Sequence, residues 1–207
     1  MKDLSIYFSD FGDVQSYSGE TVGSTVVINS AHNFNPPAKH EIALFFVPEY
    51  RNSNLVDTQK AIAEIRSQFY RLFPSNWKVP ITDLGTIKPG DTVEDTYQAV
   101  RDVVKELVKS NVFPIVVGGS QDLTLPIYEA YQSLEQTVNI LDIDCAFDMG
   151  DPDQPIAQDS WINKVLLHKP NYLFNYSLLG YQSYLMKSEE IELVNKLFFD
   201  AFRLGDF

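Results

Sequence analysis

Residues 114–124 read PIVVGGSQDLT, an apolar run that ends in two glycines and a polar group. The apolar part predicts a buried strand of a parallel sheet at 112–117, and residues 122–134 are expected to form the following helix. The glycines permit a tight turn and close backbone approach, and Ser120 or Asp122 is the expected helix cap. A helix start also offers N–H groups to an anion, but this turn lacks the lysine of a P-loop and the third glycine of a dinucleotide site. The stretch therefore predicts a strand–turn–helix unit of an α/β fold.

Residues 138–150, VNILDIDCAFDMG, repeat the pattern of a strand followed by a polar turn. Asp142, Asp144 and Asp148 lie at intervals of two and four across the end of the predicted strand 138–143, and an extended backbone places alternate residues on one side. Neighbouring carboxylates need a cation, a shared proton or hydrogen-bond donors, because an unpaired buried charge is costly. They suit hard cations such as Mg²⁺, Ca²⁺ or Mn²⁺. The alternative is that Asp148 begins a solvated acidic loop and only Asp142 or Asp144 points inward.

The single cysteine, Cys145, lies in this second turn. A catalytic thiol needs a histidine or a cationic neighbour, and the sequence supplies none nearby, so we interpret Cys145 as a small buried hydrophobe. One cysteine forms no internal disulfide, which fits a reducing compartment.

Strands and helices alternate along most of the chain. Residues 1–40, punctuated by glycines and by Pro36-Pro37, are expected to form an irregular N-terminal arm, and residues 41–207 a single α/β domain. Further strands are predicted at 41–48, 79–84 and 172–179, and further helices at 58–72, from the capping box Thr92-Val93-Glu94-Asp95 onward, at 160–167, and from Ser188 to Phe202. This alternation predicts a three-layer αβα sandwich with a mainly parallel sheet.

The composition is that of an ordinary globular protein. Of the 207 residues 44% are hydrophobic, and 16 Lys+Arg face 28 Asp+Glu, which gives a formal net charge of -12. This charge repels phosphates, so neither nucleic acid nor an anionic membrane is an expected partner. The chain contains no run of about eighteen apolar residues and no signal-like amino terminus, so we expect a cytoplasmic protein.

The two turns resemble the paired metal-binding motifs of the ureohydrolase superfamily, which includes arginase, agmatinase and formimidoylglutamase. PIVVGGSQDLT is similar to a signature that ends Gly-Gly-Asp-His-Ser, and ILDIDCAFDMG is similar to Asp-Ala-His-x-Asp. FFVPEYRNSN, AIAEIR and LGYQSY resemble further family segments in the right order, from about residue 41 to the end. The similarity is greatest to a formimidoylglutamase-like branch, and it implies an arginase/deacetylase-like fold.

The resemblance also implies a chemistry. In this family two Mn ions bridged by hydroxide hydrolyse a C–N bond of a linear guanidine or amidine and release urea or formamide. Asp144 and Asp148 keep two carboxylate ligand positions, whereas Gln121 and Ala146 stand where the motifs have histidine. Beside Gln121, Ser120 replaces the aspartate of the motif and Asp122 replaces its serine.

A further aspartate pair is expected beyond residue 207, so the resemblance implies a degenerate metal site. We expect no functional Mn centre; weak Mg or Ca binding by Asp144, Asp148 and Gln121 is a further hypothesis. Two functions follow as alternatives: a hydrolase of linear amidines, or a non-catalytic subunit for ligand binding or assembly.

The family resemblance also bears on strand order. In the family the last two strands lie between the third and fourth, and residues 1–207 are expected to lack them. The third and fourth strands then either pair directly, in a flavodoxin-like order 2-1-3-4-5, or leave a gap for a partner chain. We favour direct pairing. An incomplete sheet exposes an edge or an apolar face, so we expect a homo-oligomer or a partner subunit.

Overall fold

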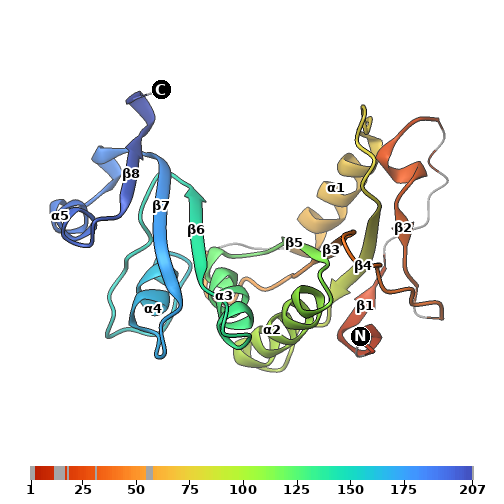
Figure 1. Ribbon diagram of the computed structural model, residues 1–207, viewed down its shortest axis with the longest axis horizontal. Helices are drawn as coiled ribbons and strands as arrows, with labels where there is room; N and C mark the ends of the chain where they lie inside the picture. The colour runs from red at the N-terminus through yellow and green to blue at the C-terminus, as the bar shows by residue number, and fades with distance from the viewer. Residues whose placement is uncertain (1–2, 12–16, 18, 31, 55–57, 207) are drawn as a thin grey trace.

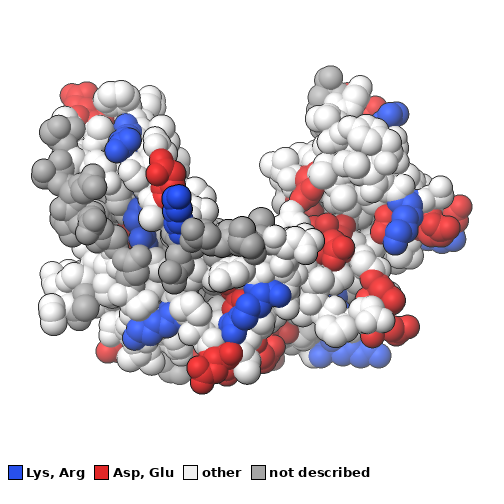
Figure 2. Space-filling model, turned by 180° about the vertical axis from the view of Figure 1, so that it is seen from behind, with Lys and Arg blue, Asp and Glu red and all other residues white. Residues whose placement is uncertain are grey.

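The computed structural model describes residues 3–11, 17, 19–30, 32–54 and 58–206. Its strands form two separate sheets that stand on a common layer of helices (Figure 1), and the surface is hollowed between the two lobes that carry them (Figure 2). The first sheet has the order β1-β4-β3-β5, with β2 also pairing with β4; the second has the order β6-β7-β8. All pairs are parallel except β1 with β4. The predicted α/β class with a mainly parallel sheet is confirmed.

The strands are β1 (Phe8–Asp10), β2 (Val27–Ile28), β3 (Ile42–Phe46), β4 (Ile81–Ile87), β5 (Phe113–Val117), β6 (Val138–Ile143), β7 (Leu173–Tyr181) and β8 (Asp200–Arg203). The α-helices are α1 (Thr58–Arg71), α2 (Val93–Lys109), α3 (Thr124–Gln132), α4 (Trp161–Leu167) and α5 (Ser188–Lys196). Short 3-10 helices lie at Ser5–Tyr7, Val22–Ser24, Gln121–Leu123, Ser183–Leu185 and Leu204–Asp206.

Alternate residues of β3 face two different helix layers. Ala43 and Phe45 pack with α2 in the largest core cluster, whereas Leu44 and Phe46 pack with Ile62 of α1 on the opposite face. This alternation follows from the period of two along a strand, and it sandwiches the first sheet between helices. The predicted capping box starts α2: the Thr92 hydroxyl accepts from the Asp95 N–H, and the Asp95 carboxylate accepts from the Thr92 N–H.

Helix α3 links the two sheets. Its Ala130 belongs to the core cluster of the first sheet, whereas its Tyr128 belongs to the cluster beneath the second sheet. The Tyr128 hydroxyl also accepts a hydrogen bond of 2.9 Å from the N–H of Tyr172, just before β7. The order β5–α3–β6 therefore passes from one sheet to the other through a helix that packs under both.

Direct pairing of β5 with β6, the order that the sequence favoured, is wrong: the structure assigns the two strands to different sheets. One physical reason lies in β5. Its Phe113 N–H donates to Glu41 on the β3 side, so the backbone of Pro114 and Val116 is turned to the other edge. Proline has no N–H, which leaves that edge short of donors for a ladder with β6.

The expected N-terminal arm is not wholly irregular. Strands β1 and β2 both pair with β4, and Leu4 and Phe8 are buried in the core. Phe8 packs edge-on against Phe45 of β3, with ring centroids 6.1 Å apart. Residues of the arm thus belong to the same core cluster as the buried face of α2.

The last predicted helix is too long. Helix α5 begins at Ser188, ends at Lys196 and is followed by Phe198 in the left-handed region, with φ of 57°. Ala201, predicted on the helix stripe, instead pairs with Leu178 in the ladder between β8 and β7. Residues whose apolar spacing also fits a helix thus form β8, a strand that pairs with β7. None of the helices in the described ranges has the length and apolar character that crossing a membrane requires.

The separation of the sheets predicts a pattern of amide exchange along β6. The N–H groups of Val138 and Asp144 donate to β7 or to the residue before it, so those of the odd positions Leu141 and Ile143 are turned to the open edge. We expect the amides of Leu141 and Ile143 to exchange roughly a hundredfold faster than those of Ile140 and Asp142, measured by hydrogen exchange and NMR. Equal protection at all four positions would mean that β5 and β6 do pair.

Candidate functional site

Loops at the carboxyl ends of β3 and β5 touch each other through their backbones. The Ser120 N–H, after β5, donates to the Glu49 carbonyl, after β3, at 3.0 Å. A Cβ on Gly119 would lie 1.9 Å from that same carbonyl oxygen, so only glycine fits there. The close backbone approach expected of the glycine turn is therefore made to a neighbouring loop.

Gln121 and Asp144 connect the end of β5 with the end of β6. The Gln121 side-chain amide donates to Asp144 Oδ2. The other carboxylate oxygen, Oδ1, accepts from the backbone N–H of Cys145 at 2.5 Å and from that of Ala146 at 3.4 Å. Both oxygens of Asp144 are thus occupied by neutral donors of the chain itself.

Asp142 and Asp148 each have a donor from an aromatic side chain. The Tyr176 hydroxyl of β7 donates to Asp142 at 2.8 Å, and the Trp161 indole N–H of α4 donates to Asp148 at 2.9 Å. The carboxylates are near enough to influence one another, since the charges of Asp144 and Asp142 both act on Asp148. The structure therefore brings the predicted acidic residues together and compensates each with neutral hydrogen bonds.

Burial raises the pKa of two of these carboxyl groups. Burial raises the pKa of Asp148 to about 7; the Trp161 hydrogen bond opposes this rise, and the negative charges of Asp144 and Asp142 add to it. Burial also raises the pKa of Asp142, against the hydrogen bond from Tyr176. Near neutral pH, a bound proton on Asp148 thus reduces the charge of the cluster.

The alternative in which Asp148 begins a solvated loop does not describe this turn. Asp148 is half-buried, and its neighbours Phe147 and Met149 are buried in the second core cluster. The exposed part of the loop begins at Gly150 and includes Asp151. The acidic loop is therefore fully exposed to solvent only after Asp148, the last candidate metal ligand in this turn.

Cys145 is a half-buried free thiol. A hydrogen bond to Asp144 and partial burial raise the pKa of this thiol, which disfavours the nucleophilic thiolate. Cys145 is therefore only partly buried and has a polar neighbour, unlike the small buried hydrophobe that the sequence predicted.

Ser120 and Asp122 do not cap the following helix, contrary to the sequence prediction. Neither side chain makes a capping hydrogen bond to the start of the 3-10 helix or of α3. Asp122 is fully buried and accepts from the hydroxyls of Tyr97 and Ser120 and from the Asn52 amide, the last at 3.1 Å. These three donors hold the carboxylate inside the protein. The Asp122 side chain therefore does not cap the N-terminus of the following helix.

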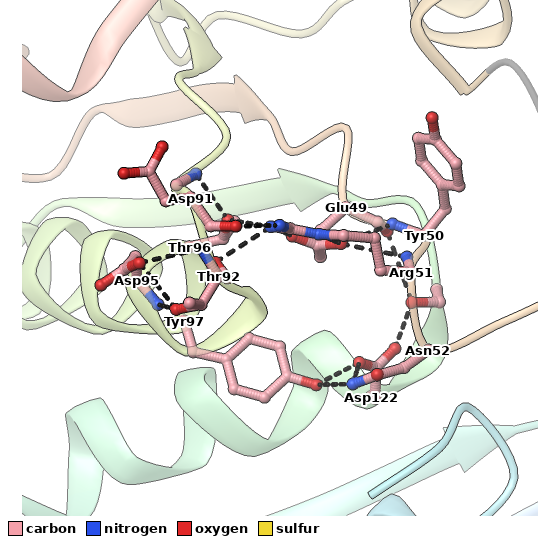
Figure 3. Close-up of polar contacts among 12 residues, drawn as sticks. Glu49, Tyr50, Arg51, Asn52, Asp91, Thr92, Asp95, Thr96, Tyr97 and Asp122 are labelled. Carbon is pink, nitrogen blue, oxygen red and sulfur yellow. Dashed lines mark hydrogen bonds and ion pairs between the residues drawn. The ribbon is translucent and has the colours of Figure 1, made fainter.

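Figure 3 shows the polar cluster that fixes the loop after β3. Glu49, only 1% exposed, receives two hydrogen bonds from the Arg51 guanidinium, at 2.9 and 2.5 Å. Arg51 also donates to the carbonyls of Asp91 and Thr92 before α2, at 2.9 and 3.0 Å. Burial pulls the pKa of Glu49 upward, but the hydrogen bonds from Arg51 outweigh it and hold that pKa below its usual value.

Sequence reasoning did not single out this cluster. A glutamate directly after a buried strand, followed two residues later by arginine, is a signal of a paired buried charge. The contacts of Tyr97, Tyr176 and Trp161 carry no such signal, because aromatic residues on a helix or strand usually indicate a core position.

The residues present do not fit a dinuclear Mn centre. Ala146 offers no lone pair, and Gln121 directs the N–H of its amide, not its oxygen, at Asp144. Within the described ranges, no group of three or more His, Cys, Asp or Glu side chains is arranged to hold a metal ion.

Known structures share this fold at low sequence identity. The formimidoylglutamase of Bacillus subtilis superposes with a TM-score of 0.78 at 12% identity, over 93% of this chain and 63% of that chain. A Mn²⁺-containing formiminoglutamase of Trypanosoma cruzi gives 0.71 at 18% identity, over 84% and 64% of the two chains. The arginase of Medicago truncatula gives 0.64 at 17% identity, over 80% and 57%.

This chain therefore spans less than two thirds of the length of each of these structures. No curated protein sequence matches it. The sequence model of the arginase family matches residues 40–204, which is most of the chain. The matched region includes the glycine turn after β5 and the aspartate turn after β6. By this match the protein belongs to the arginase family.

Proposed function

We propose that this chain is a non-catalytic member of the arginase family, in which hydrogen bonds take the place of metal ions. The observation that carries the proposal is the contact between Gln121 and Asp144. By family resemblance, Gln121 occupies a position of a metal-binding histidine. Here its amide N–H donates a hydrogen bond to the carboxylate that would otherwise bind the metal. The role left to such a chain is ligand binding or assembly with another subunit.

The chemistry of metal-dependent hydrolysis supports this proposal. Two ions held about 3.5 to 4 Å apart lower the pKa of a bridging water and position it for attack. Holding them requires lone pairs from several side chains, and Ala146 supplies none while Gln121 presents a donor. Without such ions, the half-buried acidic cluster has no Lewis acid that lowers the pKa of a bridging water molecule.

The retained carboxylates favour a second candidate function, hydrolysis of a C–N bond in a linear amidine or guanidine. Asp144 and Asp148 keep their family positions, and the Trypanosoma cruzi relative has Mn²⁺ in its structure. This function requires that a metal displace the Gln121 amide from Asp144 and the proton from Asp148. Metal binding and turnover separate the two candidates.

Replacing Asp148 with asparagine is expected to remove a pH dependence of stability. The folded pKa of Asp148, about 7, lies above the ordinary value of 3.8, so the folded state binds more protons than the unfolded state between pH 4 and 7. Stability conferred by the protonated carboxyl is therefore present at low pH and is lost as the pH rises through 7. Asparagine also tolerates the left-handed backbone of this residue, with φ of 47°.

Urea unfolding at several pH values measures this effect. At pH 8 we expect Asp148→Asn to be more stable than the wild type by roughly 1 to 2 kcal/mol, less than a fully buried group would give, because the carboxyl is partly exposed. At pH 4 the two proteins should be nearly equal. A wild-type advantage at pH 8 would indicate that the charged form of Asp148 is stabilised by a cation.

Restoring both histidines is expected not to restore catalysis. We predict that Gln121→His combined with Ala146→His, supplied with Mn²⁺, releases neither urea nor formamide from arginine, agmatine or formimidoylglutamate. The acidic cluster still lacks the further ligands that a second ion needs. Calorimetric titration with Mn²⁺, Mg²⁺ and Ca²⁺ up to millimolar concentrations measures metal binding separately from activity.

Gln121→Ala is the matched control, because it frees Asp144 from the amide without adding a ligand. Stoichiometric Mn²⁺ binding by the wild type together with turnover of any of the three substrates would overturn the proposal. Millimolar binding of Mg²⁺ or Ca²⁺ without turnover would leave the chain non-catalytic and support the weaker site formed by Asp144, Asp148 and Gln121.

A further inference from the structure

We draw no further inference here: the strongest candidate, the apolar cavity of about 530 Å³ between the end of α1 and the first sheet, is lined in part by the exposed Ile115 of β5, and nothing in the structure shows what covers it.

Discussion

The fold depends on the packing of α3 beneath both sheets, because no backbone ladder joins β5 to β6. Ala130 and Tyr128 lie two residues apart on this helix, yet they belong to different core clusters. In a continuous parallel sheet, main-chain hydrogen bonds fix the distance between neighbouring strands. Here side-chain packing and the hydrogen bond from the Tyr172 N–H to the Tyr128 hydroxyl set the position of the second sheet.

The acidic cluster shows how a half-buried group of carboxylates persists without cationic side chains. Each aspartate has a neutral donor that comes from a different element: the loop after β5 for Asp144, β7 for Asp142 and α4 for Asp148. Neutral donors lower the cost of burial but do not cancel the charge, which is why the pKa of Asp148 rises to about 7. The same turn therefore combines hydrogen bonding with partial protonation.

The elements around the two turns could be predicted from local pattern. Continuous apolar runs located β3, β5 and β6, and the Thr92–Asp95 capping box located the start of α2. Periodicity failed at 197–202, where an amphipathic helical stripe also fits a strand at the edge of a sheet. The separation of β5 from β6 could not be predicted from local sequence pattern. It depends on Pro114 at the edge of β5 and on the tertiary packing of α3.

For the candidate site, the sequence located the carboxylates but not what compensates them. Spacing and family resemblance indicated Asp144, Asp148 and Gln121, and the structure brings Gln121 and Asp144 into contact. The partners Trp161 and Tyr176 are far from the turn in sequence and look like ordinary core aromatics. Only the tertiary packing of α4 and β7 against the turn makes them hydrogen-bond donors.

The Gln121–Asp144 contact also affects the strength of the link between the sheets. A side-chain hydrogen bond to a charged carboxylate contributes about 1.5 to 3 kcal/mol net, whereas a structural metal ion contributes several times more to the folded state. A metal centre shared between the loops after β5 and β6 would therefore tie the sheets together at their carboxyl ends. With a hydrogen bond in its place, the position of the second sheet relative to the first depends mainly on the packing of α3.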